Sequence, residues 1–363
     1  MMTKPKLLVI GKYYGPDQGG IENHSYHLAH GLKKYFEVTF LAYNKSRSSE
    51  KYIDKGINVI KAGSSIILKS QPVSIKYIFH LLKHCFQADV IHIHSPNPLA
   101  EIWLLKKKNI VVTYHSDIVR QKVLYFFYRP FQQMLFKNAR KIIATSPNMA
   151  KNSSAISSFN NKTEIIPLCF TKIFQKNKSN LSLSKLKKPI VLFVGRLVRY
   201  KGVEILLQAS KLCPEHSLVI VGDGPEKFSL MKYAKKMTHV HFIGSKSGSD
   251  LTKCYSECDF LVLPSINRTE SFGIVVLEAM YFAKPVITTE LGTGTSFVNI
   301  HKKTGYVIPP NDVQSLYVAM SSLIKSPKLR KKMGSYARQR VLRNFTWGQS
   351  IISHKRILQK ARK

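Results

Sequence analysis

The sequence predicts an α/β protein built from two doubly wound halves. Three observations carry this prediction: short apolar runs that end at glycine, longer amphipathic segments between them, and a restart of the same alternation in mid-chain. A length of 363 residues is enough for two domains with substantial cores. Hydrophobic residues make up 44% of the chain, which excludes a disordered protein despite the high charge.

The first half alternates short apolar runs with longer mixed segments. The first run, Leu7–Ile10, ends at Gly11 and is typical of a buried strand. Apolar and basic residues mix in Glu22–Lys34 and Val119–Lys141, which favours helices. Strands that alternate with helices imply a parallel sheet with helices on both faces. Further strands are predicted at Val38–Ala42, Val59–Lys61, Val90–His94, Ile110–Tyr114 and Ile142–Ala144.

The second half repeats this pattern after an interruption. Residues Lys172–Lys188 are rich in Lys, Asn, Ser and Leu and predict a linker. The alternation restarts at Pro189–Gly195, and Trp347–Ala361 predicts a final amphipathic helix. Further strands are predicted at Ser217–Val221, His239–Ile243, Phe260–Leu263 and Pro285–Thr288. We therefore place an N-terminal domain at 1–172, a linker at 173–188, a second domain at 189–345 and a terminal helix at 346–363.

The composition indicates an anionic partner. The 57 Lys and Arg residues against 20 Asp and Glu give a net charge of +37, spread over both halves. Nucleic acid, a membrane surface or a phosphorylated substrate would each fit this charge. The segment Lys325–Lys363 carries many basic residues and no acidic one, either as a solvated helical surface or as a contact for anionic lipid or phosphate. The odd number of cysteines, five, argues against a disulfide framework. The apolar runs are too short for a signal peptide or a membrane-spanning helix.

Two doubly wound halves place a crevice at the carboxyl ends of their strands, so motifs at strand ends are the candidate sites. The first motif, Asp17–Glu22, contains the pair Gly19 and Gly20 just before a predicted helix. Adjacent glycines allow a ligand to approach the backbone, and the helix N-terminus offers amides to an anion. An ordinary turn would explain the pair equally well. No Gly-x-Gly-x-x-Gly fingerprint occurs here.

The second motif is Gly195–Gly202, which brings two cations to a strand end. Arg196 leaves the strand, and Lys201 precedes a helix expected to begin near Gly202. Cations beside a helix N-terminus form a phosphate or diphosphate site. The alternative is a pair of ordinary surface cations, because basic residues are abundant in this chain.

The third motif holds two carboxylates, Glu270 and Glu278, around a helix expected to start near Phe272 or Gly273. Eight residues of helix span roughly 12 Å, and the paired carboxylates of a glycoside hydrolase need about 5–10 Å. The spacing suits a ligand that lies across the helix start. Glu270 would bind sugar hydroxyls, the helix amides would bind phosphates, and Glu278 would bind a ribose diol; a satisfied core carboxylate is the alternative for Glu278.

The fourth set of candidates is histidine. His92 and His94 alternate on one strand and share a face, which could be metal geometry, but no third ligand is apparent. His115 ends a strand and is expected to face the crevice. No Asp-x-Asp occurs, so a carboxylate-held divalent cation is not supported, and Arg196 and Lys201 could replace it. We therefore expect no metal and no cofactor.

Together these motifs resemble the retaining glycosyltransferases of family 4. The resemblance rests on Glu270-x7-Glu278, Gly195-Arg-Leu with Lys201-Gly202, Gly222-Asp-Gly-Pro225 and the N-terminal Gly-Gly-Ile-Glu, in the order and spacing of the family. It implies the GT-B fold, in which two Rossmann-like domains face a central crevice. The N-terminal domain would bind the acceptor and the second domain the nucleotide sugar, and the final helix, from about Trp347, would cross back to the N-terminal domain. Thr113–Gln121 and Glu290–Ser296 further resemble a subgroup of bacterial polysaccharide and lipopolysaccharide transferases, several of them mannosyl- or rhamnosyltransferases.

The resemblance also implies a role for each motif. Arg196 and Lys201 would bind the donor diphosphate and neutralise the leaving group, and His115 would lie beside the donor sugar. Glu278 would bind the ribose. The remaining implied contacts are Glu270 and the amides of Phe272, Gly273 and Ile274 for the sugar and phosphates, Gly244 near the base, and Gly19 and Gly20 where the N-terminal domain closes over the diphosphate.

The implied reaction is the retaining transfer of a hexose, with GDP-mannose as the favoured donor, to a lipid-linked saccharide. Such an acceptor implies a cytoplasmic enzyme held peripherally at the inner face of the plasma membrane. Ile75–Phe86 and Val119–Lys141 mix aromatic and basic residues, which suits an anionic membrane surface or, alternatively, ordinary amphipathic core helices. The other functions considered are a UDP-sugar-dependent transferase, an epimerase or hydrolase of the same fold, and a non-catalytic basic binding protein. No recognised motif predicts specific nucleic-acid binding.

Overall fold

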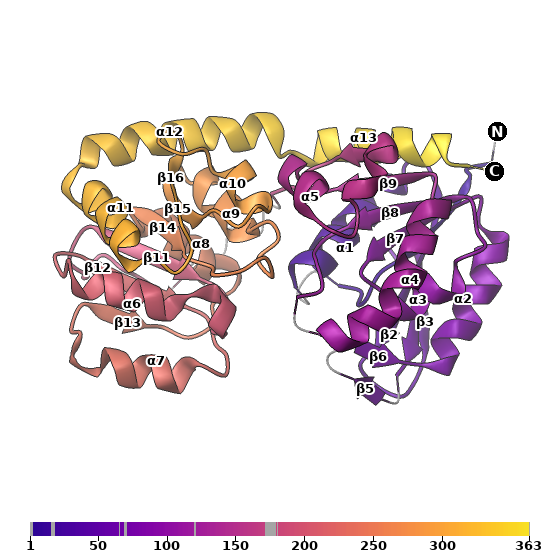
Figure 1. Ribbon diagram of the computed structural model, residues 1–363, viewed down its shortest axis with the longest axis horizontal. Helices are drawn as coiled ribbons and strands as arrows, with labels where there is room; N and C mark the ends of the chain where they lie inside the picture. The colour runs from indigo at the N-terminus through magenta and orange to yellow at the C-terminus, as the bar shows by residue number, and fades with distance from the viewer. Residues whose placement is uncertain are drawn as a thin grey trace. The chain divides into compact units, whose positions relative to one another are not determined.

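The protein divides into two compact α/β units, shown in the computed structural model in Figure 1. Unit 1 consists of Met1–Leu168 together with Trp347–Lys363, and unit 2 of Cys169–Thr346. The structure describes residues 3–15, 19–64, 66–68, 71–119, 121–170, 179 and 181–362. Residues 173–178 and 180 of the predicted linker lie outside the described residues. Within the described ranges, no helix is both long enough and apolar enough to cross a bilayer.

Unit 1 is built on an eight-stranded sheet in the order β10-β9-β8-β7-β1-β2-β4-β3. All neighbours are parallel except β3 and β4. The six strands predicted in this half are confirmed, whereas β3, β10 and a small hairpin of β5 and β6 were not predicted. The strands are β1 (Lys6–Ile10), β2 (Glu37–Asn44), β3 (Glu50–Asp54), β4 (Ile57–Gly63), β5 (Ile66–Leu68), β6 (Gln71–Val73), β7 (Val90–Ser95), β8 (Ile110–Tyr114), β9 (Lys141–Ala144) and β10 (Thr163–Ile165).

Alternating side chains of this sheet feed two cores, one on each face. Leu8 and Ile10 of β1 pack into one core, and Leu7 and Val9 pack into the other. The first core includes side chains of α2 (Ile75–Gln87), α3 (Pro98–Trp103), α4 (Lys122–Asn138) and α5 (Pro147–Asn152). The second includes those of α1 (Gly20–Leu32) and α13 (Trp347–Lys360). The sheet is therefore covered on both faces, as the sequence predicts.

One predicted helix is too long. The prediction Val119–Lys141 extends beyond α4 at both ends, because Ala139 adopts extended backbone and Lys141 already begins β9. The residues after Asn138 thus turn into the sheet instead of completing another helical turn.

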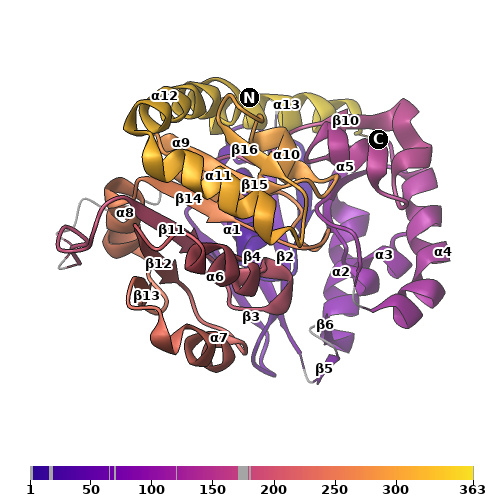
Figure 2. The same ribbon diagram turned by 60° about the vertical axis from the view of Figure 1, so that its left-hand side comes forward.

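Unit 2 is built on a fully parallel six-stranded sheet in the order β13-β12-β11-β14-β15-β16. The five strands predicted here are confirmed, and β16 was not predicted. Helix α6 packs against α11, and α9 packs against α12 (Figure 2). The strands are β11 (Ile190–Val194), β12 (Ser217–Val221), β13 (Val240–Phe242), β14 (Phe260–Leu263), β15 (Val286–Thr289) and β16 (Gly305–Ile308). The helices are α6 (Val203–Lys211), α7 (Lys227–Tyr233), α8 (Gly248–Glu257), α9 (Ile274–Tyr281), α10 (Gly294–Val298), α11 (Val313–Lys325) and α12 (Pro327–Asn344), and short 3-10 turns span Ser157–Lys162 in unit 1 and Arg199–Lys201 and Ala234–Lys236 in unit 2.

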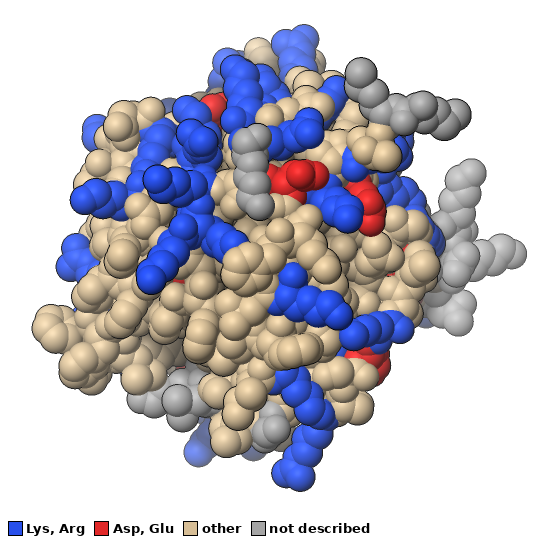
Figure 3. Space-filling view, turned by 90° about the vertical axis from the view of Figure 1, so that its right-hand side faces the viewer, with Lys and Arg blue, Asp and Glu red and all other residues tan. Residues whose placement is uncertain are grey.

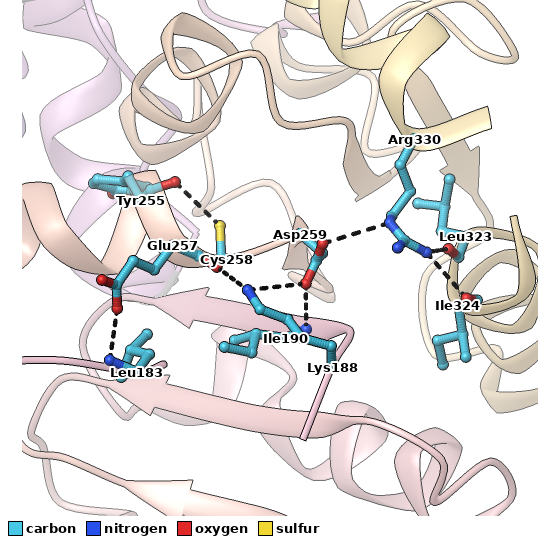
Figure 4. A network of polar contacts seen from close by, with 10 residues as sticks. All are labelled: Leu183, Lys188, Ile190, Tyr255, Glu257, Cys258, Asp259, Leu323, Ile324 and Arg330. Carbon is cyan, nitrogen blue, oxygen red and sulfur yellow. Dashed lines mark hydrogen bonds and ion pairs between the residues drawn. The ribbon is translucent and has the colours of Figure 1, made fainter. Parts of the chain in front are cut away.

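The amino ends of β11 and β14 are fastened together by Asp259 (Figure 4). Its carboxylate accepts the backbone N–H of Ile190 at 2.7 Å and forms ion pairs with Lys188 at 3.5 Å and Arg330 at 3.7 Å. The backbone N–H of Asp259 in turn donates to the carbonyl of Ile190 at 2.7 Å. These contacts fix the register of the two central strands, and the carboxyl ends of the same strands carry the candidate site.

Candidate functional site

Gly202 brings the end of β11 close to the end of β14. It adopts φ +68°, and a Cβ at this position would lie 2.1 Å from the carbonyl oxygen of Pro264. Only glycine permits that approach without displacement of the backbone. The backbone N–H of Ile266 also donates to the carbonyl of Tyr200 at 2.8 Å. The loop that carries Lys201 is therefore held against the residues that follow β14.

This approach pairs Lys201 with Glu270. The Lys201 ammonium donates to Oε2 of Glu270 at 2.6 Å, and the Ser265 hydroxyl donates to the same oxygen at 3.0 Å. Both charged residues are buried, at 9% and 8% exposure. Burial by itself lowers the pKa of Lys201, but the Glu270 carboxylate and Tyr200 together outweigh burial and raise the pKa above its ordinary value. A buried cation with a fixed partner thus lies at the carboxyl edge of the sheet.

The loop after Glu270 is held by its backbone and leads into α9. The Thr293 hydroxyl donates to the carbonyl of Glu270 at 2.8 Å, and the N–H of Gly294 donates to the carbonyl of Ser271 at 2.7 Å. Gly273 adopts φ +75° and is the N-cap of α9, which has no side-chain cap. Phe272 is buried, and Ile274 opens the helix. Uncapped amides at a helix start are suited to an anion.

Glu278 lies on the second turn of α9 and is buried, at 7% exposure. Its Oε2 accepts a hydrogen bond from the Tyr255 hydroxyl at 2.5 Å. Burial raises the pKa of Glu278, and the hydrogen bond from Tyr255 partly counteracts this rise. The carboxylate therefore has one internal partner, as the core alternative anticipated. A carboxylate can accept further hydrogen bonds, so this contact is compatible with a ligand role.

Arg196 and Gly244 follow β11 and β13, two strands that β12 separates in the sheet of unit 2. Arg196 is exposed and follows Gly195 immediately after β11. A Cβ at Gly222 would lie 1.9 Å from the carbonyl oxygen of Gly195, and the N–H of Gly222 donates to the carbonyl of Gly244 at 3.0 Å. The loops after β11, β12 and β13 are thus packed backbone to backbone. The candidate residues of unit 2 gather along one edge of its sheet.

Gly19 and Gly20 open α1 in unit 1. Gly19 is the N-cap with φ +151°, and its carbonyl accepts the N–H of Asn23 at 2.9 Å. Both glycines are exposed. Residues 16–18, which include Asp17 of the predicted motif, lie outside the described residues.

His115 belongs to a buried cluster of five histidines in unit 1. Its Nε2 lies 2.8 Å from Nδ1 of His94, and Nε2 of His92 lies 2.7 Å from the Thr113 hydroxyl. Burial lowers the pKa of His115 to about 3 and keeps the ring neutral at physiological pH. The described residues contain no group of three or more His, Cys, Asp and Glu that could hold a metal ion. His92 and His94 are both buried. The cluster is completed by His24 and His354, and His24 stacks on Trp347 at a centroid distance of 5.2 Å.

Sequence reasoning missed several residues that shape the site. Ser265 and Thr293 position Glu270, and Tyr255 contacts Glu278. A weak signal existed for Ser265, because it follows a predicted strand by two residues, and for Thr293, because it lies in a Gly- and Thr-rich run after another strand. No sequence signal pointed to Tyr255, because it is one of many aromatic residues on amphipathic helices.

Comparisons with known proteins extend over almost the whole chain. Residues 18–170 match the family described as "Glycosyltransferase Family 4", and residues 174–340 match "Glycosyl transferases group 1". An "O-antigen chain mannosyltransferase C" of Escherichia coli is 32% identical over 360 residues, which cover 96% of each chain. A "D-rhamnosyltransferase WbpZ" of Pseudomonas aeruginosa is 34% identical over 297 residues, 79% of this chain and 78% of the other. The solved sucrose-phosphate synthase of Thermosynechococcus elongatus superposes with a TM-score of 0.82 at 22% identity, over 98% of this chain and 99% of that one.

Proposed function

The chain belongs to glycosyltransferase family 4 and has the GT-B fold of two Rossmann-like domains, and from this premise we propose which transfer it catalyses. The proposed donor is a nucleoside-diphosphate hexose, with GDP-mannose favoured, and the proposed acceptor is a lipid-linked saccharide of a cell-surface polysaccharide. The names of the mannosyl- and rhamnosyltransferase relatives support this choice of sugar. We further propose that the sugar keeps its anomeric configuration and that no metal takes part.

The observation that carries the proposal is the buried Lys201–Glu270 pair beside the uncapped start of α9. An ammonium group has three N–H donors, so Lys201 can bond to a phosphate oxygen while it keeps its contact with Glu270. Arg196 adds a second cation in the same loop as Lys201, after β11. We assign the donor diphosphate to these cations and to the amides of α9, and the ribose to Glu278.

The proposed reaction follows from this charge distribution. The bond between the anomeric carbon and the phosphate oxygen breaks, and its electron pair stays with the diphosphate. The acceptor hydroxyl oxygen bonds to the anomeric carbon on the face that the diphosphate leaves, and its proton passes to a leaving phosphate oxygen. Fixed cations and amides stabilise the developing negative charge more strongly in the transition state than in the ground state. No protein base is required, and Arg196 and Lys201 take the place of a divalent cation.

The test of the donor site is a thermal-shift screen with GDP, UDP, dTDP and ADP, each with and without EDTA. Binding to the folded state raises Tm by mass action. We expect one nucleotide to raise Tm, without an effect of EDTA, and Glu278→Ala to abolish the shift. The matched control is Glu215→Ala, which removes an exposed carboxylate before β12, at the opposite edge of the sheet, and should keep the shift. A chain that responds to none of the four nucleotides would contradict the proposal.

The remaining outcomes separate other functions. A response to UDP alone would replace GDP-mannose by a UDP-sugar. Conversion of the donor in the absence of an acceptor would indicate an epimerase or hydrolase. Binding to nucleic acid with a steep, sequence-independent salt dependence, in a chain that ignores nucleotides, would indicate a non-catalytic basic protein.

Attachment to an anionic membrane is a second part of the proposal. Large apolar side chains of α4 and α2 are exposed, among them Phe126 at 74%, Phe127 at 68% and Ile75 at 85%. Lys122 and Arg129 of α4 are also exposed, and they flank Phe126 and Phe127 along the helix. Figure 3 shows unit 1 from a side where Lys and Arg greatly outnumber acidic side chains. Apolar side chains interleaved with cations favour the surface of an anionic bilayer.

Vesicle sedimentation tests this attachment. We expect the chain to bind vesicles that contain anionic lipid at low salt and to ignore neutral ones, with binding weakened by Phe126→Asp and Phe127→Asp. Equal binding by these variants would remove α4 from the membrane contact. A localisation at the inner face of the plasma membrane is proposed on this basis.

A further inference from the structure

Unit 1 contains a cavity of about 370 Å³ beyond the carboxyl ends of its central strands. Lys12 lines it after β1, Pro96 and Pro98 line it after β7, and Ile118 and Gln121 line it after β8. The strand order reverses between β1 and β7, since β2 lies on the other side of β1. Doubly wound sheets bind ligands at such a switch point, and the volume is in the range of small-molecule sites. The cavity therefore has the position and the volume that are typical of a ligand site, and all its lining residues belong to unit 1.

The wall of this cavity is largely apolar, although Lys12, Gln71 and Gln121 also line it. Val73, Ile102 and Leu124 join the prolines and Ile118 in lining it, together with Tyr125 and Tyr128. The Tyr125 hydroxyl donates to Oε1 of Gln132 at 3.2 Å, and the Tyr128 hydroxyl donates to Glu101. Both phenol protons are thus used inside the protein. The rings that remain offer hydrocarbon surface to the cavity.

The network behind the wall is anchored by the fully buried Glu101. Its Oε1 accepts the N–H of Asn97 at 2.8 Å, and Gln132 donates through Nε2 to Tyr128 at 3.1 Å. Burial raises the pKa of Glu101, and the hydrogen bonds it accepts work against this rise. A satisfied buried carboxylate between α3 and α4 holds the two helices and keeps the tyrosines in place.

The cavity is continuous with the exposed apolar surface of unit 1. Val73, Ile102 and Leu124 line the cavity and are also 42%, 38% and 43% exposed. Val123, next to Leu124, is 73% exposed but does not line the cavity. Two exposed cations lie beside these apolar residues in the sequence: Lys76 follows Ile75, and Lys122 precedes Val123. An apolar cavity that opens through an apolar and cationic surface is complementary to an amphiphile that carries an anionic head.

We propose that this cavity binds the hydrocarbon chain of the acceptor next to its phosphate, with Lys12 facing the phosphate. The occupant is a membrane-borne lipid in which a hydrocarbon chain is joined through phosphate to a saccharide. This inference rests on the proposed function, because it names the part of the acceptor that unit 1 recognises. It predicts that the enzyme's affinity for the acceptor depends on the lipid chain as well as on the sugar.

The test compares two acceptors with the same saccharide and diphosphate, one with a long prenyl chain and one with a single methyl group, both assayed in detergent micelles with the full chain. Each methylene removed from the cavity should raise KM about fourfold. We expect KM for the prenyl acceptor to be at least tenfold lower than for the methyl acceptor. Ile102→Glu and Leu124→Glu should raise KM for the prenyl acceptor at least tenfold and leave KM for the methyl acceptor and the donor within twofold.

Val123→Glu is the matched control, because it places the same charge on α4 outside the cavity. It should weaken vesicle binding and leave both KM values in micelles unchanged. Since Ile102 and Leu124 are partly exposed, their variants should keep the wild-type Tm, and circular dichroism checks this.

The failures of the two proposals are distinguishable. Equal KM values for the two acceptors, or the same effect from Val123→Glu as from Leu124→Glu, would overturn the cavity assignment and leave the transferase proposal intact. Absence of transfer to both acceptors, together with no nucleotide-induced rise in Tm, would overturn the proposed function and the cavity assignment with it.

Discussion

Nδ1 of His94 lies 2.8 Å from Nε2 of His115, and the two rings stack at an interplanar angle of 18° inside unit 1. Burial lowers the pKa of both histidines, so each ring carries one proton. One of these protons is shared in the contact. Nδ1 of His115 has no hydrogen-bond partner among the described residues. The tautomer of His94 therefore sets whether His115 presents a donor or an acceptor at its second nitrogen.

Replacement of His94 should separate orientation from packing. Asn places an amide near the position of Nδ1, whereas Gln places it near Nε2. We expect His94→Asn to keep the contact with His115 and most of kcat. His94→Gln should lose the contact and lower kcat by about 5- to 150-fold, because the loss of a buried hydrogen bond costs about 1–3 kcal/mol. Steady-state kinetics with the donor and acceptor measure this, and equal kcat values for the two variants would count against a positioning role.

Acid should destabilise unit 1 through its histidine cluster. Burial lowers the pKa of His115 to about 3 and that of His354 to about 4, below the ordinary 6.5. The unfolded chain then binds more protons than the folded chain between pH 6.5 and these values. Stability is present above pH 6.5 and is lost as the pH falls through this window, by about 2 kcal/mol per histidine at pH 5.

Tryptophan fluorescence during urea unfolding at pH 7 and pH 5 measures this effect. Both tryptophans of the chain, Trp103 and Trp347, belong to unit 1, so the signal reports on this unit. His354→Leu should reduce the difference in unfolding free energy between pH 7 and pH 5 by the contribution of one histidine, about 2 kcal/mol. An unchanged pH dependence in this variant would refute the assignment.

The Lys201–Glu270 pair should prove more important for activity than for stability. Removal of one partner leaves a buried charge uncompensated, and we expect Lys201→Met or Glu270→Leu to lower the unfolding free energy by about 3–5 kcal/mol. The double variant should recover most of this loss, because no charge remains buried. It should still fail to transfer sugar. Denaturation followed by circular dichroism and an activity assay give the two readouts, and an active double variant would contradict the role assigned to Lys201.

Two glycines with similar backbone angles should respond differently to alanine. Gly202 and Gly244 adopt φ +68° and +70°. A Cβ at Gly202 would lie 2.1 Å from the Pro264 carbonyl oxygen, whereas nothing lies within 4 Å of a Cβ at Gly244. We expect Gly244→Ala to cost about 1 kcal/mol from its left-handed backbone and Gly202→Ala about 3 kcal/mol or more from the added overlap. Thermal denaturation compares them, and equal losses of Tm would show that the β11 and β14 loops are not tightly packed.

The strands were predictable because their signal is local. Continuous apolar runs such as Ile110–Tyr114 require burial on both sides, and only a covered parallel strand provides that. Short strands such as β3 and β10 were not predicted, because their residues are mostly exposed or half-buried and their extended conformation depends on neighbours in the sheet. The length of α4 was overestimated for a related reason: a mixed apolar and basic composition continues past Asn138, where the sheet imposes extended backbone.

The sequence by itself determined the alternation of strands and helices, the order of the motifs and the chemical type of each candidate residue, because all three depend on neighbours along the chain. Only the tertiary structure decided which residues meet. It joined Lys201 to Glu270 through the close approach at Gly202, and it brought His24 near His354 from opposite ends of the chain. It also formed the apolar cavity of unit 1 from loops after three strands. Such contacts arise from packing between distant segments, and local sequence patterns carry no record of them.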